Sequence, residues 1–415
     1  MYFTAITDSR YKINQISVNF ITDFRDDDSF TRSDYAAAAY ILTESCKKYP
    51  DHKSLSEKLL DLYDGSLTSS TSLIHNTQRR TTVKGGVLDD RYALNGEKLV
   101  RELTELICRC IFEPLADNGA FDETSAALMK TELIDTIDSV MNDKSAYAAR
   151  NAAMIAYKGE PGALSVNGTH EQAEQVTASS AYGAYRKLLE TGHIEIMAAG
   201  CSDFAESREI FAEAFSSLNR SEDKICGLHS TYSQLKPEPV YVADKFPMQQ
   251  AILRMYLKSA KPVDVYANKV FAMILGGMTT SRFFSDIREK QSLCYYCSAG
   301  INSISRTLVC YAGVEPCNVE KTEEAILAEI RDIRENGVSE DELARAKREM
   351  TEGYSSMYDS SGSLISWYMG QLTDKEFLSP AEYAERINKV TAEDVLKAAE
   401  YSLDTVYVLM SEENQ

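Results

Sequence analysis

The chain is poor in histidine and lacks long apolar runs. Only 5 of its 415 residues are His (His52, His75, His170, His193 and His229), and no two lie at the spacing of paired metal ligands. No apolar run approaches the roughly 18–20 residues that a membrane-spanning helix needs. The sequence also does not begin with a basic segment followed by an apolar core. We therefore expect a cytoplasmic protein without a signal peptide or a membrane span.

The number of cysteines and the net charge indicate the state of the thiols and the kinds of partner to expect. The 9 Cys are odd in number and scattered, which suits reduced thiols better than a disulfide framework. The net charge of -19 makes nucleic acid and anionic membranes poor partners and would attract a basic peptide or subunit. Alternatively, the negative charge serves only to keep the protein soluble.

One pair of cysteines has the sequence spacing of metal ligands. Cys294 and Cys297 are spaced like half of a zinc ribbon, but no second pair follows at a useful distance. Residues i and i+3 of a strand point to opposite faces. We therefore expect two separate buried thiols here and no metal site.

The two halves of the sequence are similar in organisation. Helix starts of the same kind, with Thr177 and Thr391 as expected N-caps, lie 214 residues apart, and each is followed by a helix and a strand. Residues 218–239 show no periodicity and contain the breaker Pro237-Glu238-Pro239. We expect an N-terminal domain over residues 1–217, a linker over 218–239 and a C-terminal domain over 240–415.

The order of elements predicts the fold class. Alternating segments such as residues 16–22 predict strands, and amphipathic segments such as residues 98–112 predict helices. Several strands lie close enough together in sequence for hairpins. These patterns predict an α+β protein of two homologous domains, each a mixed or antiparallel sheet with packed helices.

The most specific string runs from Leu275 to Tyr296 (LGGMTTSRFFSDIREKQSLCYY). It combines a Gly-rich turn at Gly276 and Gly277, a helix carrying Arg288, and a strand carrying Tyr295 seven residues later. An Arg offers a fixed fork of donors to peptide carbonyls, and a Tyr hydroxyl can donate to a developing oxyanion. Glycines let a backbone approach a ligand closely. Tyr296 is a rival for the Tyr role, although the spacing favours Tyr295.

This string resembles the substrate-clamping segment of the pitrilysin-like (M16, insulinase) metallopeptidases. The resemblance implies the two-domain α/β-sandwich metallohydrolase fold, and it implies that Arg288 and Tyr295 contact the substrate and its tetrahedral intermediate, with Gly276 and Gly277 beside them. The family also binds extended substrate by main-chain pairing with an edge strand. Which strand is that edge is left open by the sequence.

The family's zinc motif, His-x-x-Glu-His, is missing from the sequence. Anchoring on Lys47-Lys48-Tyr49-Pro50 places the two His positions on Ala36 and Tyr40 and the catalytic Glu on Ala39. The distal ligand position falls near Thr136, and a shifted alignment would put Glu132 there instead. Ala cannot bind a metal, so we expect no cofactor in this chain and zinc in a partner.

The resemblance implies a non-catalytic bacterial subunit of a two-chain peptidase. It would form a heterodimer with a zinc-carrying M16 subunit, or a homodimer when alone, and would bind peptides without activity of its own. An alternative is a peptide-binding or scaffolding protein of the same fold with no role in proteolysis. A third possibility, a nucleophilic enzyme using Cys201 or Ser202, lacks a histidine base placed near either residue.

Overall fold

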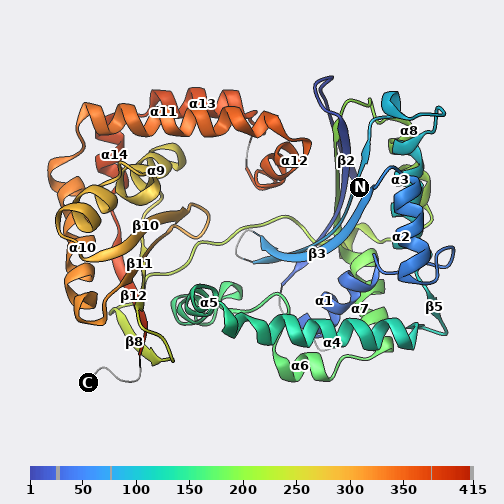
Figure 1. Ribbon diagram of the computed structural model, residues 1–415, viewed down its shortest axis with the longest axis horizontal. Coiled ribbons are helices and arrows are strands. Elements are labelled where there is room, and N and C mark those ends of the chain that lie inside the picture. The colour runs from blue at the N-terminus through green and yellow to red at the C-terminus, as the bar shows by residue number, and fades with distance from the viewer. Residues whose placement is uncertain (25–28, 75–76, 375, 412–415) are drawn as a thin grey trace. The chain divides into compact units, whose positions relative to one another are not determined.

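The computed structural model describes residues 1–24, 29–74, 77–374 and 376–411, and the chain divides into two compact units (Figure 1). Unit 1 contains Met1–Ser139, Leu164–Ser230 and Tyr358–Phe377. Unit 2 contains Val140–Ala163, Thr231–Met357 and Leu378–Gln415. Each unit thus includes a short segment from the other half of the sequence.

Unit 1 is built on a five-stranded sheet of order β1-β7-β2-β4-β3. Its strands are β1 (Tyr2–Thr7), β2 (Ile13–Asp23), β3 (Ser66–Ile74), β4 (Gln78–Leu88) and β7 (His193–Gly200), with a small hairpin of β5 (Ala116–Asp117) and β6 (Ala120–Phe121). Its helices are α1 (Arg32–Ile41), α2 (His52–Asp61), η1 (Asp90–Tyr92), α3 (Leu99–Phe112), α4 (Glu123–Ser139), α6 (His170–Glu174), α7 (Ala178–Thr191), α8 (Ala205–Ser216), η4 (Glu222–Lys224) and α12 (Ser361–Met369).

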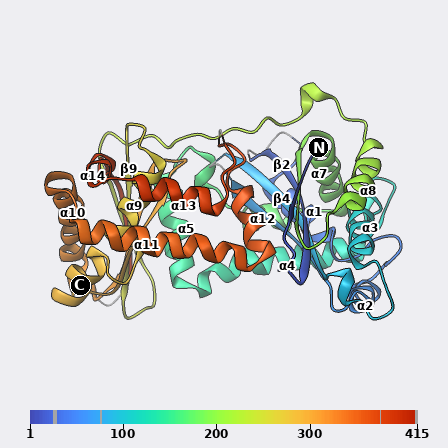
Figure 2. The same ribbon diagram turned by 90° about the horizontal axis from the view of Figure 1, so that it is seen from above.

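Unit 2 is built on a sheet of order β10-β11-β9-β12-β8. Its strands are β8 (Val240–Lys245), β9 (Ala251–Lys258), β10 (Cys294–Asn302), β11 (Thr307–Val314) and β12 (Ser402–Met410). Its helices are η2 (Val140–Asn142), α5 (Lys144–Ala156), η3 (Pro161–Ala163), α9 (Val265–Ala272), η5 (Met273–Gly277), η6 (Phe283–Lys290), η7 (Pro316–Asn318), α10 (Val319–Asn336), α11 (Glu340–Ser356), α13 (Pro380–Lys389) and α14 (Ala392–Ala398). The turn η8 (Met357–Asp359) follows α11. Figure 2 shows α11 and α13 side by side.

The two sheets have the same topology. In each, one outer strand pairs in parallel with the last strand of its half, β1 with β7 and β8 with β12, and the remaining pairs are antiparallel. The predicted N-caps Thr177 and Thr391 both form capping boxes, at the starts of α7 and α14. The predicted α+β fold with duplicated domains is therefore confirmed.

One helix of each unit comes from the opposite half of the sequence. In unit 2, α5 places Ala148, Ala152 and Ala156 against strand residues such as Ile252 and Leu409. Small alanines let the helix approach the sheet closely. In unit 1, α12 contacts β2 and β7. These two helices follow α4 and α11, so they are equivalent elements of the duplication.

The segment expected as a linker has little regular structure. All of residues 218–239 are described, and among them η4 is the one helical turn. The described part of the chain contains no helix of the length and apolarity needed to cross a membrane. The division into domains at residues 217 and 240 remains our proposal.

Candidate functional site

The expected zinc-motif positions lie on α1. Thr31 caps this helix in a capping box with Asp34, and the following run of alanines favours helix. Ala36 and Ala39 are 0% and 1% exposed, so they serve close helix packing. Tyr40 is partly buried, and its hydroxyl donates to Asn167 Oδ1 at 3.3 Å. Burial raises the pKa of Tyr40, which keeps the phenol protonated.

The distal ligand position is on α4. Thr136 is exposed to solvent there. Glu132, one turn earlier, is the carboxylate whose charge contributes to the raised pKa of Tyr40. Tyr40 thus has Asn167 as its hydrogen-bond partner and is influenced by the charge of Glu132.

A zinc ion does not fit this set of residues. Ala36 and Ala39 carry no donor atom, and a protonated Tyr40 is a poor metal ligand. Elsewhere in the described ranges, no group of three or more His, Cys, Asp or Glu could hold a metal ion. His75 lies outside the described residues.

The Gly-rich turn of the expected clamp ends a helix in unit 2. Asp264 caps α9, whose last turns widen into the π-type turn η5. Gly276 is buried, and a Cβ there would lie 2.5 Å from the Ala299 amide nitrogen of β10. The close approach at Gly276 is thus to β10, whereas Gly277 is exposed.

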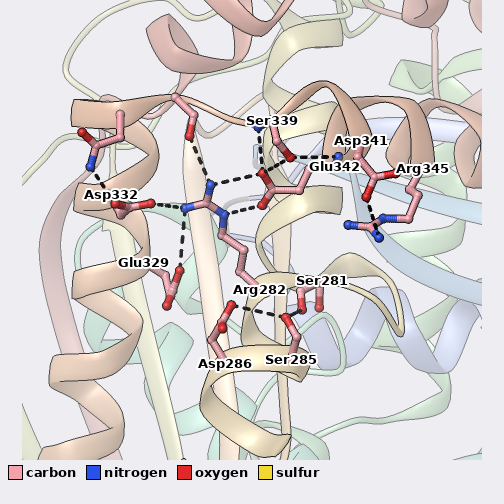
Figure 3. A network of polar contacts seen from close by, with 12 residues as sticks. Ser281, Arg282, Ser285, Asp286, Glu329, Asp332, Ser339, Asp341, Glu342 and Arg345 are labelled. Atoms are coloured by element: carbon pink, nitrogen blue, oxygen red, sulfur yellow. Dashed lines mark hydrogen bonds and ion pairs between the residues drawn. The ribbon is translucent and has the colours of Figure 1, made fainter. Parts of the chain in front are cut away.

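The helix η6 carries Arg288 and is fixed at its start by Arg282 (Figure 3). The Arg282 side chain is 12% exposed and donates from Nε to Glu342 Oε1 at 2.7 Å and from Nη1 to Asp332 Oδ2 at 2.5 Å. Its Nη2 also donates to the Gly337 carbonyl at 3.1 Å. One guanidinium therefore joins η6 to the end of α10 and the start of α11.

The Arg288 side chain is partly exposed and makes few close contacts. Its side chain is 40% exposed, and its Nε lies 3.8 Å from Glu289 Oε1. The guanidinium carbon lies 4.6 Å from the centroid of the Phe284 ring. Phe283 and Ile287, which are fully buried, anchor the opposite face of η6. Arg288 thus keeps much of its donor fork available to a ligand.

Tyr295 and Tyr296 have different surroundings on β10. Tyr295 is 48% exposed, and its hydroxyl donates to Glu315 Oε1. This hydrogen bond raises the pKa of Tyr295. Tyr296 lies over Gly313, where a Cβ would come within 2.3 Å of its ring, and tilts against Tyr311. Tyr296 therefore packs on its neighbouring strand, and Tyr295 has the more open hydroxyl.

The expectation that Cys294 and Cys297 face opposite sides of the strand was wrong. Cys294 lies opposite Val314 and Cys297 opposite Ala312, because a β-bulge interrupts the register between Cys294 and Tyr296. The extra residue turns both thiols to one face. Cys297 is buried, whereas Cys294 is partly exposed, and the neighbouring Cys297 thiol lowers the pKa of Cys294.

Each sheet has an edge strand in the equivalent position, which the sequence did not identify. The sheet orders place β3 at the edge of unit 1 and β10 at the edge of unit 2. β3 (SLTSSTSLI) contains no charge and no Pro, and its pairing with β4 shows no bulge. Edge strands without such protection readily accept another strand. The run of small, uncharged polar residues in β3 was the sequence feature that could have indicated this edge strand.

Comparison with known proteins shows what this chain is similar to. Residues 175–350 match the family described as the Peptidase M16 inactive domain. The probable inactive metalloprotease YmfF of Bacillus subtilis (strain 168) is 24% identical over 384 residues, which span 91% of this chain and 89% of that protein.

Solved structures share the fold. A conserved protein from Enterococcus faecalis V583 superposes with a TM-score of 0.88 at 23% identity, over 100% of this chain and 97% of that one. A peptidase M16 inactive domain from Pseudomonas fluorescens gives 0.77 at 15% identity, over 100% and 96%. The resemblance to the pitrilysin-like M16 family is thereby confirmed, and residues 175–350 are similar to the inactive domain of that family.

Proposed function

We propose that this chain is a non-catalytic M16-like subunit that binds extended peptide and completes the active site of a zinc-carrying partner. The observation that carries the proposal is a contrast between two sets of positions. Ala36 and Ala39 are buried and without donors, whereas Arg288 and Tyr295 present open polar groups. A subunit of this kind would hold substrate and leave the activation of water to its partner.

The chemistry of the open residues supports peptide binding. Arg288 can donate two parallel hydrogen bonds to peptide carbonyls. The Tyr295 hydroxyl donates to Glu315, and the raised pKa of Tyr295 keeps that hydroxyl a donor at neutral pH. A developing oxyanion in the partner's site would compete with Glu315 for that proton. The net charge of -19 favours basic peptides.

The edge strand β3 supplies a second mode of recognition in this proposal. Its uncharged, unbulged edge suits main-chain pairing with an extended peptide, and such pairing gives affinity with little dependence on sequence. A probe peptide with N-methylated backbone amides should then bind more weakly than its unmodified parent.

Peptide binding is tested with the purified chain alone. A fluorescein-labelled, unstructured basic peptide is titrated by fluorescence anisotropy. Arg288→Ala is expected to weaken binding about tenfold, equivalent to about 1.4 kcal/mol, through the loss of charged hydrogen bonds. Arg348→Ala removes the same charge from an exposed position on α11 and should have little effect. Equal affinity of Arg288→Ala and the unmodified chain would reject the clamp.

The role in trans is tested with the partner. Purification from native extract should yield a second chain that contains His-x-x-Glu-His and bound zinc. In that complex, Arg288→Ala with Tyr295→Phe should lower kcat of the partner's peptidase reaction. An unchanged rate would favour the alternative, a scaffolding protein of the same fold.

A further inference from the structure

Two thiols on β10 flank the bulge at Tyr295 and share one face of the strand. Cys294 lies opposite Val314 and Cys297 opposite Ala312 on β11, so the two cysteines occupy neighbouring positions on that face. The two thiols also influence each other electrostatically, since each shifts the pKa of the other. The side chains are therefore already close before any bond forms between them.

The two thiols differ in reactivity. Cys294 is partly exposed, and the hydrogen bond from Cys297, together with the charge of Arg288, lowers its pKa below the ordinary value. Cys297 is 8% exposed, and donating that hydrogen bond, together with burial, raises its pKa well above the ordinary value. One thiol is thus an accessible nucleophile and the other a protonated neighbour, an arrangement typical of reactive cysteine pairs.

We propose that Cys294 and Cys297 form a reversible oxidation site, at which a low-molecular-weight disulfide converts the two thiols into an intramolecular disulfide. This site does not depend on the proposed peptidase role. The Cys294 thiolate attacks one sulfur of the reagent, forms a mixed disulfide and releases one thiolate. Cys297 then loses its proton and attacks Cys294 Sγ, which releases the second thiolate. The two cysteines are oxidised by two electrons, and the reagent is reduced to two thiols.

A second thiol pair in unit 1 provides an internal comparison. Cys46 accepts a hydrogen bond from Cys110, and this bond lowers the pKa of Cys46 to about 6. Both residues are 0% exposed, so a reagent in solution cannot reach either sulfur. The two pairs therefore differ in whether a dissolved reagent can reach a sulfur atom, as it can at the partly exposed Cys294.

Cys310 is a further thiol on this face of the sheet. It lies opposite Ala299 on β11, on the same face as Cys297, and it is fully buried. Burial raises its pKa strongly. Cys310 therefore serves as a matched control that is close to the pair and chemically inert.

The site is tested by mass spectrometry of the full chain. The folded protein is incubated in glutathione buffers that range from fully reduced to fully oxidised, alkylated and then cleaved after Lys and Arg. Residues 291–306 hold Cys294 and Cys297, whereas Cys310 and Cys317 lie together in residues 307–321. In oxidised buffer, the peptide of residues 291–306 should carry no alkyl group and should be two hydrogen atoms lighter than the unalkylated dithiol form. Reduction before alkylation should restore the doubly alkylated peptide. Cys46 and Cys110 should stay reduced.

Single variants separate the two steps. Cys297→Ser should accumulate a glutathione adduct on Cys294, and Cys294→Ser should leave Cys297 reduced in the same buffer. Cys310→Ser should behave like the unmodified chain. The proposal is overturned if both thiols of the unmodified chain remain free in fully oxidised glutathione. It is also overturned if a mixed disulfide persists without ring closure, or if ring closure is lost in Cys310→Ser.

Discussion

Polar residues of unit 2 differ strongly in their exposure to solvent. Arg288 and Tyr295 are partly exposed, whereas Lys258 and Asp404 are 1% and 0% exposed. Lys258 Nζ lies 3.3 Å from Asp404 Oδ1, and Lys236 Nζ lies 2.6 Å from Asp404 Oδ2. Both ammonium groups also donate to the Ala156 carbonyl at the end of α5. This network ties α5 and the segment before β8 to the sheet.

Asp404→Asn should destabilise the protein by about 3–5 kcal/mol, because two lysines near the core would lose their counter-charge. The matched control Asp135→Asn, at an exposed position on α4, should change stability by less than about 0.5 kcal/mol. Urea unfolding measures both. A loss for Asp404→Asn no larger than that of the control would contradict the assigned role.

The same carboxyl group predicts a pH dependence. Burial opposes its ionisation, but hydrogen bonds from Lys236 and Thr405 outweigh burial, so the pKa of Asp404 lies below its ordinary value. Its stabilising contribution is therefore fully present above about pH 4, the unfolded value, and is lost as the pH falls through the lower folded pKa. The stability difference between the unmodified chain and Asp404→Asn should shrink in that acid range.

Gly276 and Gly353 differ in the space that is available for a side chain. Gly276→Ala would place a Cβ 2.5 Å from the Ala299 amide nitrogen and 2.7 Å from Phe283, so it should cost about 1–3 kcal/mol by overpacking. Gly353 lies on the exposed side of α11, and a Cβ added there would have no atom within 4 Å. Gly353→Ala should stabilise by about 0.5–1 kcal/mol, since it restricts the unfolded chain. Thermal unfolding of the two variants should shift in opposite directions.

At the scale of elements, the position of η6 depends on its link to α10 and α11. Arg282→Met removes the guanidinium that bridges Glu342 and Asp332 (Figure 3). We expect a loss of about 2–3 kcal/mol and faster amide exchange over residues 283–290. Arg282→Lys should recover part of both effects, because it keeps the charge and loses the planar fork. Unchanged exchange in Arg282→Met would show that other contacts position η6.

Local chemistry explains which elements could be predicted from the sequence. Thr177, Thr391 and Ser339 form the capping boxes that their neighbouring residues indicate. The bulge at Tyr295 could not be predicted, because it depends on pairing between β10 and β11 and not on β10 alone. The π-type turns η5 and η6 likewise follow from packing on β10. Of the candidate site, the sequence indicated residue types and spacing, while exposure and partners required the fold.

At the scale of the whole molecule, each unit depends on a helix from the opposite half of the sequence. In unit 1, Ile365, Met369 and Leu372, in and just after α12, cover Ile21 and Met197 of the sheet. No sequence pattern shows this exchange, because it joins residues that lie far apart in the sequence. The boundaries proposed from composition therefore divide the sequence repeats and not the compact units.

A fragment of residues 1–217 should consequently fold poorly. It lacks α12, and the sheet face that α12 covers would be exposed to water. We expect it to bind a hydrophobic dye and to lack the thermal transition of the full chain, and co-expression with residues 218–415 should restore that transition. A fragment that unfolds cooperatively at the temperature of the full chain would contradict this dependence.

We infer that the residues at the zinc-motif positions of this chain do not bind a metal ion. The most direct measurement is elemental analysis of the purified full chain after equilibration with zinc and removal of free ions. Because Ala36 and Ala39 offer no donors and Tyr40 holds its proton, we predict far less than one zinc ion per chain. About one firmly held zinc ion per chain, released when Tyr40→Phe and Glu132→Gln are introduced, would contradict the account.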